Sequence, residues 1–237
     1  GLCSNGRWPG VPLRTVLNAS GLKANAYDVV FFGADRGEEE VEWRTQKYTV
    51  EQQFGRSLTR EHAMAQEPLL AWAMNGQPLT KHQGAPLRLV VPGWYGVANV
   101  KWLAQIHVQD EQYLGRFQAR WYRTLKGEMI DGEMKWKESA ISKLRIKSVI
   151  ARVTTNGSQL TSHGYILHDG SPLKSVEVSV NDGPWQMATF DKTTSAQKYS
   201  WKLFTYSFPS LPAGDHTIVS RVTDAKGDVQ PTVKDLE

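Results

Sequence analysis

Two apolar runs, each with one cation among its apolar residues, give the chain its most distinctive hydrophobic pattern. Leu87–Val91 contains Arg88, and Val97–Val108 contains Lys101, with Pro92-Gly93 between the runs. The pattern predicts two β-strands joined by a turn. A cation in an apolar strand costs free energy unless an anion meets it, so the two runs together indicate an anionic ligand.

A period of two divides the second run into two faces. The apolar face is expected to hold Val100, Trp102 and Ile106. The polar face is expected to hold Asn99, Lys101, Gln105 and His107. Lys101 therefore keeps a second interpretation, as an ordinary solvated lysine on the polar face of a strand. Arg88 is harder to explain in that way, because apolar residues flank it on both sides.

Shorter patterns predict the elements that come before these runs. They are a short helix at Pro12–Asn18, a buried strand at Tyr27–Gly33, an acidic surface loop at Asp35–Trp43, a helix capped by Thr59 that runs to Gln66, and a strand at Leu69–Met74. Asn75-Gly76 follows the last of these strands and is a strong signal for a type I′ hairpin turn, because both residues accept positive φ.

The pattern changes in the second half of the chain. Residues 112–137 are polar and irregular but rich in aromatic side chains, so we expect an ordered excursion without regular structure. From Ile146 onwards short alternating strands follow one another, as in Val176, Val178 and Val180. Such spacing predicts a β-sandwich of immunoglobulin type, with a domain boundary near residues 140–150.

Composition narrows the class of protein. The chain has 237 residues, 40% of them hydrophobic and 22% charged, which predicts a globular protein with a sizeable core. A net charge of +4 without a dense Lys/Arg block favours anionic partners and gives no support for nucleic acid binding. No run of apolar residues is long enough to span a membrane. The single cysteine, Cys3, excludes an internal disulfide and a zinc site built on several cysteines.

Common catalytic motifs are missing from the sequence. The six histidines form no His-x-x-x-His or His-Glu-x-x-His pair, so each is best interpreted as a surface or polar-network histidine. The chain has no Gly-x-Ser-x-Gly, phosphate-binding loop or Gly-x-Gly-x-x-Gly motif. Arg88 and Lys101 remain as candidates, since Arg suits bidentate contact with a phosphate and Lys suits a point contact. Tyr122 lies among cations and aromatic residues that favour an anion pocket.

A series of motifs runs in order along the chain. They are Arg7–Leu13, Ala71–Gly76 (Ala-Trp-Ala-Met-Asn-Gly), Gln83–Arg88 (Gln-Gly-Ala-Pro-Leu-Arg), Val90–Gly93 (Val-Val-Pro-Gly), Val100–Leu103 (Val-Lys-Trp-Leu), Lys147–Ile150 and Gln230-Pro231. This series resembles the molybdopterin-dependent sulfite oxidases and sulfite dehydrogenases over essentially the whole chain. Trp94-Tyr95 and Tyr122-Arg123 are most similar to bacterial sulfite dehydrogenases.

The resemblance implies roles for five residues. Arg88 and Lys101 would bind the molybdenum–molybdopterin cofactor, chiefly at its phosphate end, which agrees with the cations in apolar runs. Gln83 and Asn99 stand at two further pterin-contacting positions, where other members have His and Ser. Tyr122 matches the active-site tyrosine of the family, whose hydroxyl lies near the molybdenum oxo group and the substrate.

Three departures from the family pattern matter. Trp121 precedes the tyrosine, where many members have Asp, so the usual hydrogen bonding around Tyr122 is altered. Cys3 does not match the molybdenum ligand, because the continuous match through Arg7–Leu13 places it in a later segment. The resemblance therefore implies a ligating cysteine upstream of this chain, and no metal ligand within it. A second sulfite-binding Arg is implied beyond Glu237.

By this resemblance the fold is α+β. Residues 1–145 would be the C-terminal portion of a molybdopterin-binding oxidoreductase domain of mixed α/β structure, and residues 146–237 an immunoglobulin-like dimerisation domain. The implied function is oxidation of sulfite to sulfate, with electrons passed to a cytochrome c-type haem acceptor, in a periplasmic homodimer. A sulfane dehydrogenase or another molybdopterin oxidoreductase is the first alternative. A catalytically silent binding or dimerisation module is the second.

Overall fold

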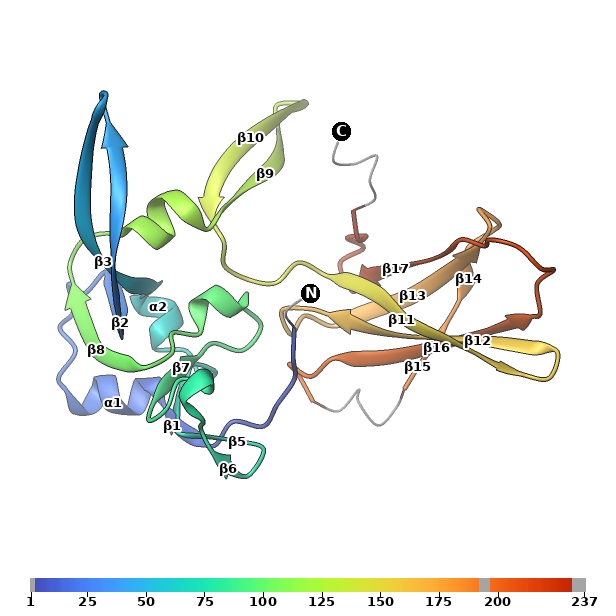
Figure 1. The fold of residues 1–237 in the computed structure, drawn as a ribbon, viewed down its shortest axis with the longest axis horizontal. Coiled ribbons are helices and arrows are strands. Elements are labelled where there is room, and N and C mark those ends of the chain that lie inside the picture. The colour runs from blue at the N-terminus through green and yellow to red at the C-terminus, as the bar shows by residue number, and fades with distance from the viewer. Residues whose placement is uncertain (1–2, 192–196, 232–237) are drawn as a thin grey trace. The chain divides into compact units, whose positions relative to one another are not determined.

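The computed structural model describes residues 3–191 and 197–231, and these are mostly β-strands with few helices (Figure 1). Residues 6–142 form one compact unit, and residues 143–237 form the other together with residues 1–5. The sequence analysis predicted a mixed α/β structure for the first half of the chain. The structure has little helix there, because both of its α-helices are short. In the described part of the chain, no helix has the length and apolar character needed to cross a membrane.

Two antiparallel sheets organise the unit of residues 6–142. One has the order β3 (Gln46–Thr59), β2 (Asp28–Trp43), β8 (Leu103–Gln109). The other has the order β1 (Gly10–Pro12), β4 (Leu69–Ala71), β7 (Arg88–Val90). Their shared core is built from fully buried side chains that include Leu13, Val29, Phe31, Leu89 and Val100. The apolar run predicted at Tyr27–Gly33 thus supplies the centre of this core, as expected of a buried strand.

Local signals predicted several short elements correctly. Helix α1 (Leu13–Ala19) begins directly after Pro12. Helix α2 (Arg60–Ala63) is shorter than predicted, but the Thr59 hydroxyl does accept from the His62 backbone N–H at 3.4 Å. Strands β5 (Ala73–Met74) and β6 (Gln77–Pro78) pair across Asn75 and Gly76, whose φ angles are 52° and 80°. These positive angles confirm the predicted hairpin turn.

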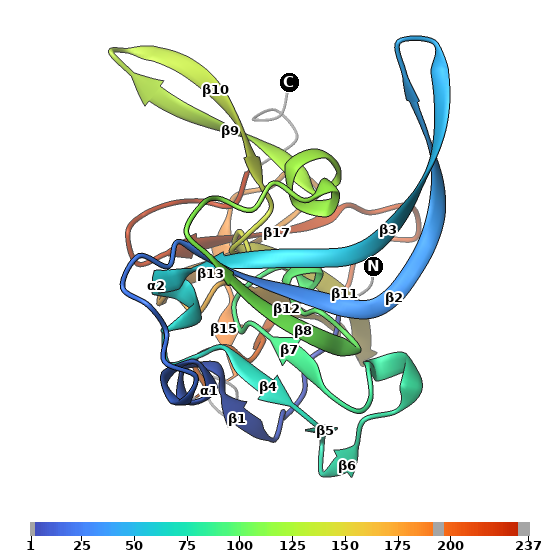
Figure 2. The ribbon, with the colours of Figure 1, turned by 90° about the vertical axis from the view of Figure 1, so that its left-hand side faces the viewer.

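The predicted acidic loop at residues 35–43 is wrong. Strand β2 continues through these residues to Trp43, and its far half pairs with β3 in the long hairpin seen in Figure 2. Val41 lies opposite Tyr48 and Glu42 lies opposite Lys47, so these acidic residues belong to a paired strand. The cross-strand partners stabilise an extended chain that the acidic composition alone does not indicate.

The predicted strand at residues 97–108 is only half present. Strand β8 begins at Leu103, and the residues before it form a 3-10 turn, η2 (Gly96–Ala98), followed by an irregular segment. Val100 is buried in the core and accepts at its carbonyl from the Leu89 N–H at 2.9 Å, while Trp102 has a φ of 48°. Val100 is buried and Ile106 packs against the core, as predicted for the apolar face. Trp102 does not follow the predicted alternation, because a positive φ interrupts the strand geometry.

Residues 112–137 contain regular structure that the sequence analysis did not predict. A single π-helical turn, η3 (Phe117–Trp121), leads into a hairpin of β9 (Arg123–Ile130) and β10 (Glu133–Ala140). Asp131 and Gly132 turn this hairpin with φ angles of 54° and 81°. Asp-Gly is the same kind of turn signal as Asn75-Gly76, and Met134 and Trp136 alternate with charged residues after it. The sequence analysis therefore missed a local hairpin signal here.

The other unit contains two antiparallel sheets that share one apolar core. The sheets have the orders β11 (Lys147–Asn156), β12 (Gln159–Leu167), β16 (Lys202–Pro209), β15 (Thr189–Phe190), and β14 (Gln186–Met187), β13 (Leu173–Val180), β17 (Ile218–Asp224). Ile166 and Phe204 come from the first sheet, and Val176, Val178 and Val222 come from the second. The predicted alternation at Val176 and Val178 is confirmed, since both are fully buried.

Two motifs far apart in the sequence meet in this unit. The Gln230 side-chain oxygen accepts from the Ser148 N–H at 2.5 Å and from the Ser148 hydroxyl at 2.8 Å. The Ser220 hydroxyl donates to the Ser148 hydroxyl at 2.9 Å. Ser148 is buried, so without Gln230 its backbone donor would lack an acceptor. This contact gives Lys147–Ile150 and Gln230-Pro231 a joint structural role.

His168 makes the stability of this unit sensitive to pH. Its ring is buried and neutral, with Nε2 donating to the Ser200 carbonyl at 3.0 Å and Nδ1 accepting from the Gly170 N–H at 3.1 Å. Burial lowers the pKa of His168; nearby Lys202 acts in the same direction, and the Ser200 carbonyl and Asp169 oppose it. Because protonation removes the Nδ1 acceptor, the neutral form is the one that the fold stabilises.

We therefore expect the unit to lose stability as the pH falls below about 6.5, the pKa of an unfolded histidine. The loss should be about 1 kcal/mol, the net value of one hydrogen bond. His168→Gln should flatten the dependence of the melting temperature on pH between about 7.5 and 5. His216→Gln, at an exposed histidine of the same unit, should leave it unchanged. An equally steep pH dependence in the His168 variant would contradict this prediction.

Candidate functional site

Gln83 lies at the end of a 3-10 turn, η1 (Lys81–Gln83), where it closes a capping box. Its side-chain oxygen accepts from the Thr80 N–H at 2.9 Å, and the Thr80 hydroxyl accepts from the Gln83 N–H at 3.3 Å. The Gln83 amide nitrogen lies 3.9 Å from the Met74 sulfur. The side chain thus holds the loop that carries Lys81 and His82, and its NH₂ group is available for a further contact.

Arg88 joins two loops through backbone carbonyls. Its two terminal nitrogens donate to the Gln83 carbonyl at 2.8 Å and to the Asn99 carbonyl at 3.1 Å. The guanidinium also lies over the Trp8 ring, 4.9 Å from its centroid. Burial lowers the pKa of Arg88, although arginine stays protonated under ordinary conditions. Its Nε is buried and has no hydrogen-bond partner among the described residues.

Asn99 and Lys101 complete the arrangement from the irregular segment before β8. The Asn99 side-chain oxygen accepts from the Val91 N–H at 2.7 Å. Lys101 Nζ donates to the His82 carbonyl at 3.2 Å and lies 4.3 Å from the centre of the Trp102 ring. Gly84 has a φ of 98°, and a Cβ placed there would lie 2.7 Å from Lys101 Cβ. Only glycine allows the η1 loop to approach Lys101 this closely.

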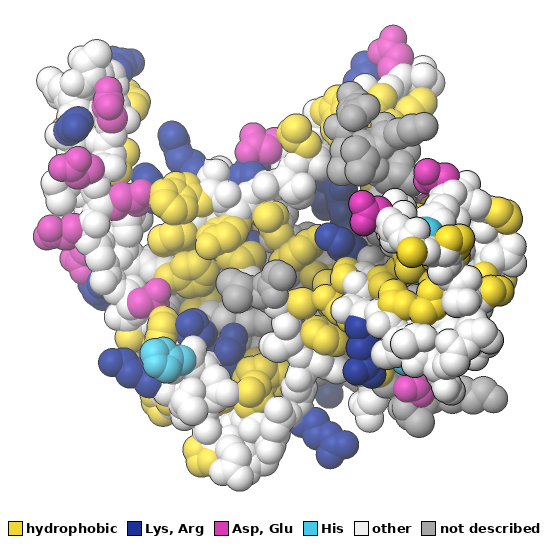
Figure 3. Space-filling view, turned by 45° about the vertical axis from the view of Figure 1, so that its right-hand side comes forward, with side chains coloured by type: hydrophobic (Ala, Val, Ile, Leu, Met, Phe, Trp, Pro, Cys, Tyr) yellow, Lys and Arg dark blue, Asp and Glu magenta, His cyan; other side chains and the backbone are white. Residues whose placement is uncertain are grey.

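The structure therefore gathers four predicted residues into what we call the basic cluster: Gln83, Arg88, Asn99 and Lys101. Among residues 3–191 and 197–231, no carboxylate forms an ion pair with Arg88 or Lys101. Figure 3 shows a His side chain with a few Lys and Arg side chains beside it at the lower left, and other Lys and Arg side chains spread over the same view. The lysine ammonium has three donors and uses one here, so the cluster can accept an anionic group.

Tyr122 lies at the other end of the candidate site, directly after η3. Its backbone N–H donates to the Phe117 carbonyl at 3.3 Å, and its carbonyl accepts from the Ile141 N–H at 2.9 Å. The residue is 38% exposed, and its hydroxyl has no hydrogen-bond partner in the described part of the chain. Trp121 beside it is 57% exposed and packs edge-on against Phe117. The phenol is thus displayed at the surface on a fixed backbone.

No described hydrogen bond, ion pair or ring contact joins Tyr122 to the basic cluster. Both belong to the unit of residues 6–142, but they are supported by different elements. The cluster rests on η1, β7 and the segment before β8, whereas Tyr122 rests on β3, η3 and the end of β10. Any ligand that engages both must bridge these two supports.

The sequence analysis missed Arg56. This residue of β3 is 2% exposed, and its terminal nitrogens donate to the Phe117 carbonyl at 3.0 Å and the Ile141 carbonyl at 2.7 Å. The signal that identified Arg88 was also present here, because Arg56 is a cation in a run bounded by Phe54 and Leu58. Gly55 and Ser57 made the run look less apolar than it is in the fold.

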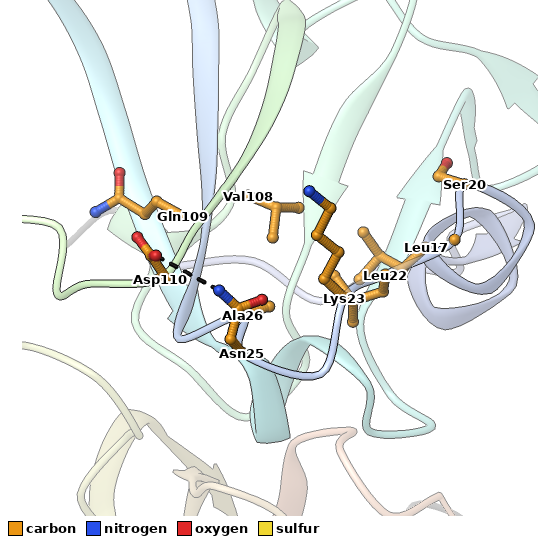
Figure 4. A pocket seen from close by; sticks show the side chains of 10 residues that line it. Leu17, Ser20, Leu22, Lys23, Asn25, Ala26, Val108, Gln109 and Asp110 are labelled. Carbon is orange, nitrogen blue, oxygen red and sulfur yellow. Dashed lines mark hydrogen bonds between the residues drawn. The ribbon is translucent and has the colours of Figure 1, made fainter.

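A surface pocket of about 380 Å³ lies elsewhere in the same unit, between the end of α1 and the end of β8 (Figure 4). Leu17 and Val108 form apolar walls, and Asn25 donates to the Asp110 carboxylate at 3.5 Å. None of the predicted site residues lines this pocket. The candidate site is therefore defined by the cluster and Tyr122, and not by this cavity.

The described residues contain no group of three or more His, Cys, Asp or Glu side chains that could hold a metal ion. Cys3 is exposed, with its sulfur 3.6 Å from the Tyr165 hydroxyl, and it belongs to the unit that contains residues 143–237.

Comparisons with known proteins agree with the motifs. Residues 1–117 match the model of the oxidoreductase molybdopterin binding domain. The chain is 32% identical to mitochondrial sulfite oxidase of Homo sapiens over 247 aligned positions, covering 98% of this chain and 43% of that protein. It is 29% identical to inducible nitrate reductase [NADH] 1 of Glycine max, covering 94% of this chain and 27% of that protein. The chain thus spans less than half the length of these relatives.

A solved structure shares the fold along nearly the whole chain. The sulfane dehydrogenase SoxCD from Paracoccus pantotrophus superimposes with a TM-score of 0.75 at 26% identity, covering 98% of this chain and 55% of that chain. The sequence relatives and this structural neighbour carry three different printed activities. The fold and motifs identify the cofactor class more closely than they identify the substrate.

Proposed function

This chain belongs to the sulfite oxidase family of molybdopterin proteins, and from this premise we propose that its protein oxidises sulfite to sulfate and passes the electrons to a cytochrome c-type haem acceptor. One observation carries the proposal. A basic cluster without carboxylate partners and a tyrosine with an exposed phenol lie in the same compact unit. Sulfite and the cofactor phosphate are both anions, so such a unit suits both.

The family cofactor is molybdenum–molybdopterin, and the basic cluster fits its anionic end. Lys101 is the residue of the cluster with free donors, so we assign it the direct contact with the phosphate. The two terminal nitrogens of Arg88 donate to backbone carbonyls, and its buried Nε is the remaining donor. We therefore assign Arg88 mainly to holding the two loops together. Gln83 contributes its NH₂ group, and Asn99 keeps its loop in place.

Tyr122 is assigned to the reaction itself. Overall, sulfite and water give sulfate, two protons and two electrons. The cofactor, when bound, supplies the redox and oxygen-transfer chemistry. The Tyr122 hydroxyl has no hydrogen-bond partner among the residues that the structure describes, so it can donate a hydrogen bond to the bound anion and assist the movement of a proton. The exposed Trp121 beside it stands where many family members have Asp, so this chain has no negative charge at that position to repel sulfite.

Two alternatives remain distinct. The likeness to SoxCD favours a sulfane dehydrogenase as the second candidate, with a protein-bound sulfur as substrate. The third is a catalytically silent binding or dimerisation module.

For the protein as a whole we also propose a periplasmic homodimer, in which residues 146–237 form an immunoglobulin-like dimerisation domain and residues 1–145 are part of the molybdopterin domain. The two-sheet core of the second unit supports the immunoglobulin-like assignment.

Metal analysis and substrate turnover of the full-length protein distinguish these functions. Its molybdenum content would be measured by mass spectrometry, and turnover would be compared for sulfite, thiosulfate and a protein-bound sulfane sulfur with cytochrome c as acceptor. Stoichiometric molybdenum and turnover chiefly with sulfite are expected. Turnover only with protein-bound sulfur would select the sulfane dehydrogenase, and a protein free of molybdenum would refute both oxidoreductase proposals.

A further inference from the structure

Arg56 is a buried cation to which the proposed chemistry gives no role. It is 2% exposed, and no carboxylate pairs with it in the described ranges. Burial lowers the pKa of its guanidinium, and nearby Tyr113 and Tyr122 partly offset this effect. Its Nε is also buried, with no hydrogen-bond partner in the described part of the chain. Burying a charge without a counter-ion costs free energy. The two hydrogen bonds that the Arg56 terminal nitrogens donate are what offset this cost, so their acceptors indicate what the residue is for.

Those two contacts go to the peptides that hold Tyr122. Arg56 donates to the Phe117 carbonyl at 3.0 Å, and the same oxygen accepts from the Tyr122 N–H at 3.3 Å. Arg56 also donates to the Ile141 carbonyl at 2.7 Å, and the Ile141 N–H donates to the Tyr122 carbonyl at 2.9 Å. One guanidinium thus fixes both backbone partners of Tyr122, one on each side. A planar fork of donors can span two carbonyls in this way, whereas a lysine ammonium is a single point charge.

The next residue on β3 secures the same turn. The Ser57 N–H donates to the Gln118 side-chain oxygen at 2.9 Å, and the Gln118 amide donates to the Ser57 hydroxyl at 2.8 Å. The buried Asp28 accepts from the Ser57 hydroxyl at 2.9 Å and from the Tyr113 N–H at 2.8 Å. These contacts anchor η3 to the core sheet without touching the peptides around Tyr122. Arg56 is the β3 residue that contacts the two backbone partners of Tyr122.

We propose that Arg56 is a positioning residue that holds Tyr122 in place for the reaction. The inference rests on the function proposed for Tyr122. Turns of the π type often occur at functional sites, and η3 ends directly before the tyrosine. No hydrogen bond holds the Tyr122 hydroxyl within the described ranges, so the backbone contacts largely set where the phenol lies, next to the Arg56 guanidinium. Loss of the clamp should displace the hydroxyl without removing any group that touches the substrate.

The kinetic test uses Arg56→Lys in the full-length, cofactor-loaded protein. The variant keeps the charge but can reach only one of the two carbonyls. We expect kcat/KM for sulfite to fall about 10- to 100-fold with unchanged molybdenum content, since small displacements of a reacting group cost this much. Adding Arg56→Lys to Tyr122→Phe should cause no further loss, because Arg56 acts through the missing hydroxyl. Losses that multiply in the double variant would overturn the proposal.

Amide hydrogen exchange supplies a readout that does not depend on activity. Arg56→Lys should accelerate exchange at the Tyr122 and Ile141 amides, and Arg116→Lys should not. Arg116 is the matched control, because it lies at the start of η3 and donates to the Glu39 carboxylate instead of the Tyr122 peptides. Unchanged exchange in the Arg56 variant, or equal acceleration in the Arg116 variant, would contradict the clamp.

The proposal can still be tested if Arg56→Lys does not fold or if Tyr122→Phe has normal kinetics. If Arg56→Lys does not fold, exchange is measured in the unmodified protein. The Tyr122 and Ile141 amides should then be protected like those of the buried Phe31, and exchange as fast as at the Asp131 turn would refute the proposal. If Tyr122→Phe leaves kinetics unchanged, the proposed function fails. The exchange data would still report separately whether Arg56 fixes the tyrosine backbone.

Discussion

Replacement of Tyr122 by phenylalanine should lower the turnover of sulfite by about 100-fold, the usual contribution of a proton-transferring or hydrogen-bonding group at a reaction centre. The affinity for sulfite should fall as well, because the hydroxyl would bind the anion in the ground state. Molybdenum content should stay the same. The substitution removes one oxygen atom that has no hydrogen-bond partner in the described structure, so it leaves no protein group unsatisfied.

The measurement is steady-state kinetics with sulfite and cytochrome c, together with metal analysis of the same preparation. Tyr27→Phe is the matched control, since Tyr27 is also exposed in the same unit but lies away from η3. The control should retain normal kinetics. Normal kinetics in the Tyr122 variant itself would remove this residue from the mechanism.

Replacement of Arg88 by alanine should reduce cofactor content by about 10- to 100-fold at limiting cofactor concentration. Two charge-assisted hydrogen bonds to the Gln83 and Asn99 carbonyls would be lost, each worth about 1.5–3 kcal/mol. The loops that present Lys101 would then lose the contact that joins them, and the two partly buried carbonyls would need new donors. Arg88 thus affects the cofactor mainly through the arrangement of its neighbours.

Molybdenum and pterin would be measured per chain, and the melting temperature would be recorded in parallel. Arg36→Ala removes the same charge from an exposed ion pair with Glu51, so it should leave cofactor content and stability nearly unchanged. Lys101→Ala should reduce cofactor content with a smaller loss of stability, because Lys101 donates only to the His82 carbonyl. Full cofactor occupancy in Arg88→Ala would contradict the role assigned to the cluster.

The sequence predicted well wherever a signal acts over a few residues. Asn75-Gly76 turns a hairpin because these residue types accept positive φ without help from the rest of the fold. The Thr59 cap needs only the next few N–H groups, and the alternation of Val176 and Val178 reports the two faces of one strand. The cation in the run around Arg88 correctly indicated a half-buried charge.

Predictions failed where a partner strand decides the conformation. Residues 35–43 form a strand because β3 lies beside them, and the hairpin of β9 and β10 depends in the same way on its own pairing. The segment Asn99–Trp102 leaves the strand geometry because Val100 is drawn into the core. Cross-strand pairing and core packing are long-range interactions, which composition and local periodicity do not encode directly.

By itself the sequence determined the order of the motifs, the cofactor class and the two cations that an anion would meet. The tertiary structure decided what those cations do. Arg88 donates to two backbone carbonyls and Lys101 donates to one, and Arg56, which the sequence analysis missed, donates to two more. Every residue carries the same carbonyl, so no residue type in the sequence marks these acceptors. Only the fold shows which loops the arginines hold together, and that Tyr122 is fixed by a residue far from it in the chain.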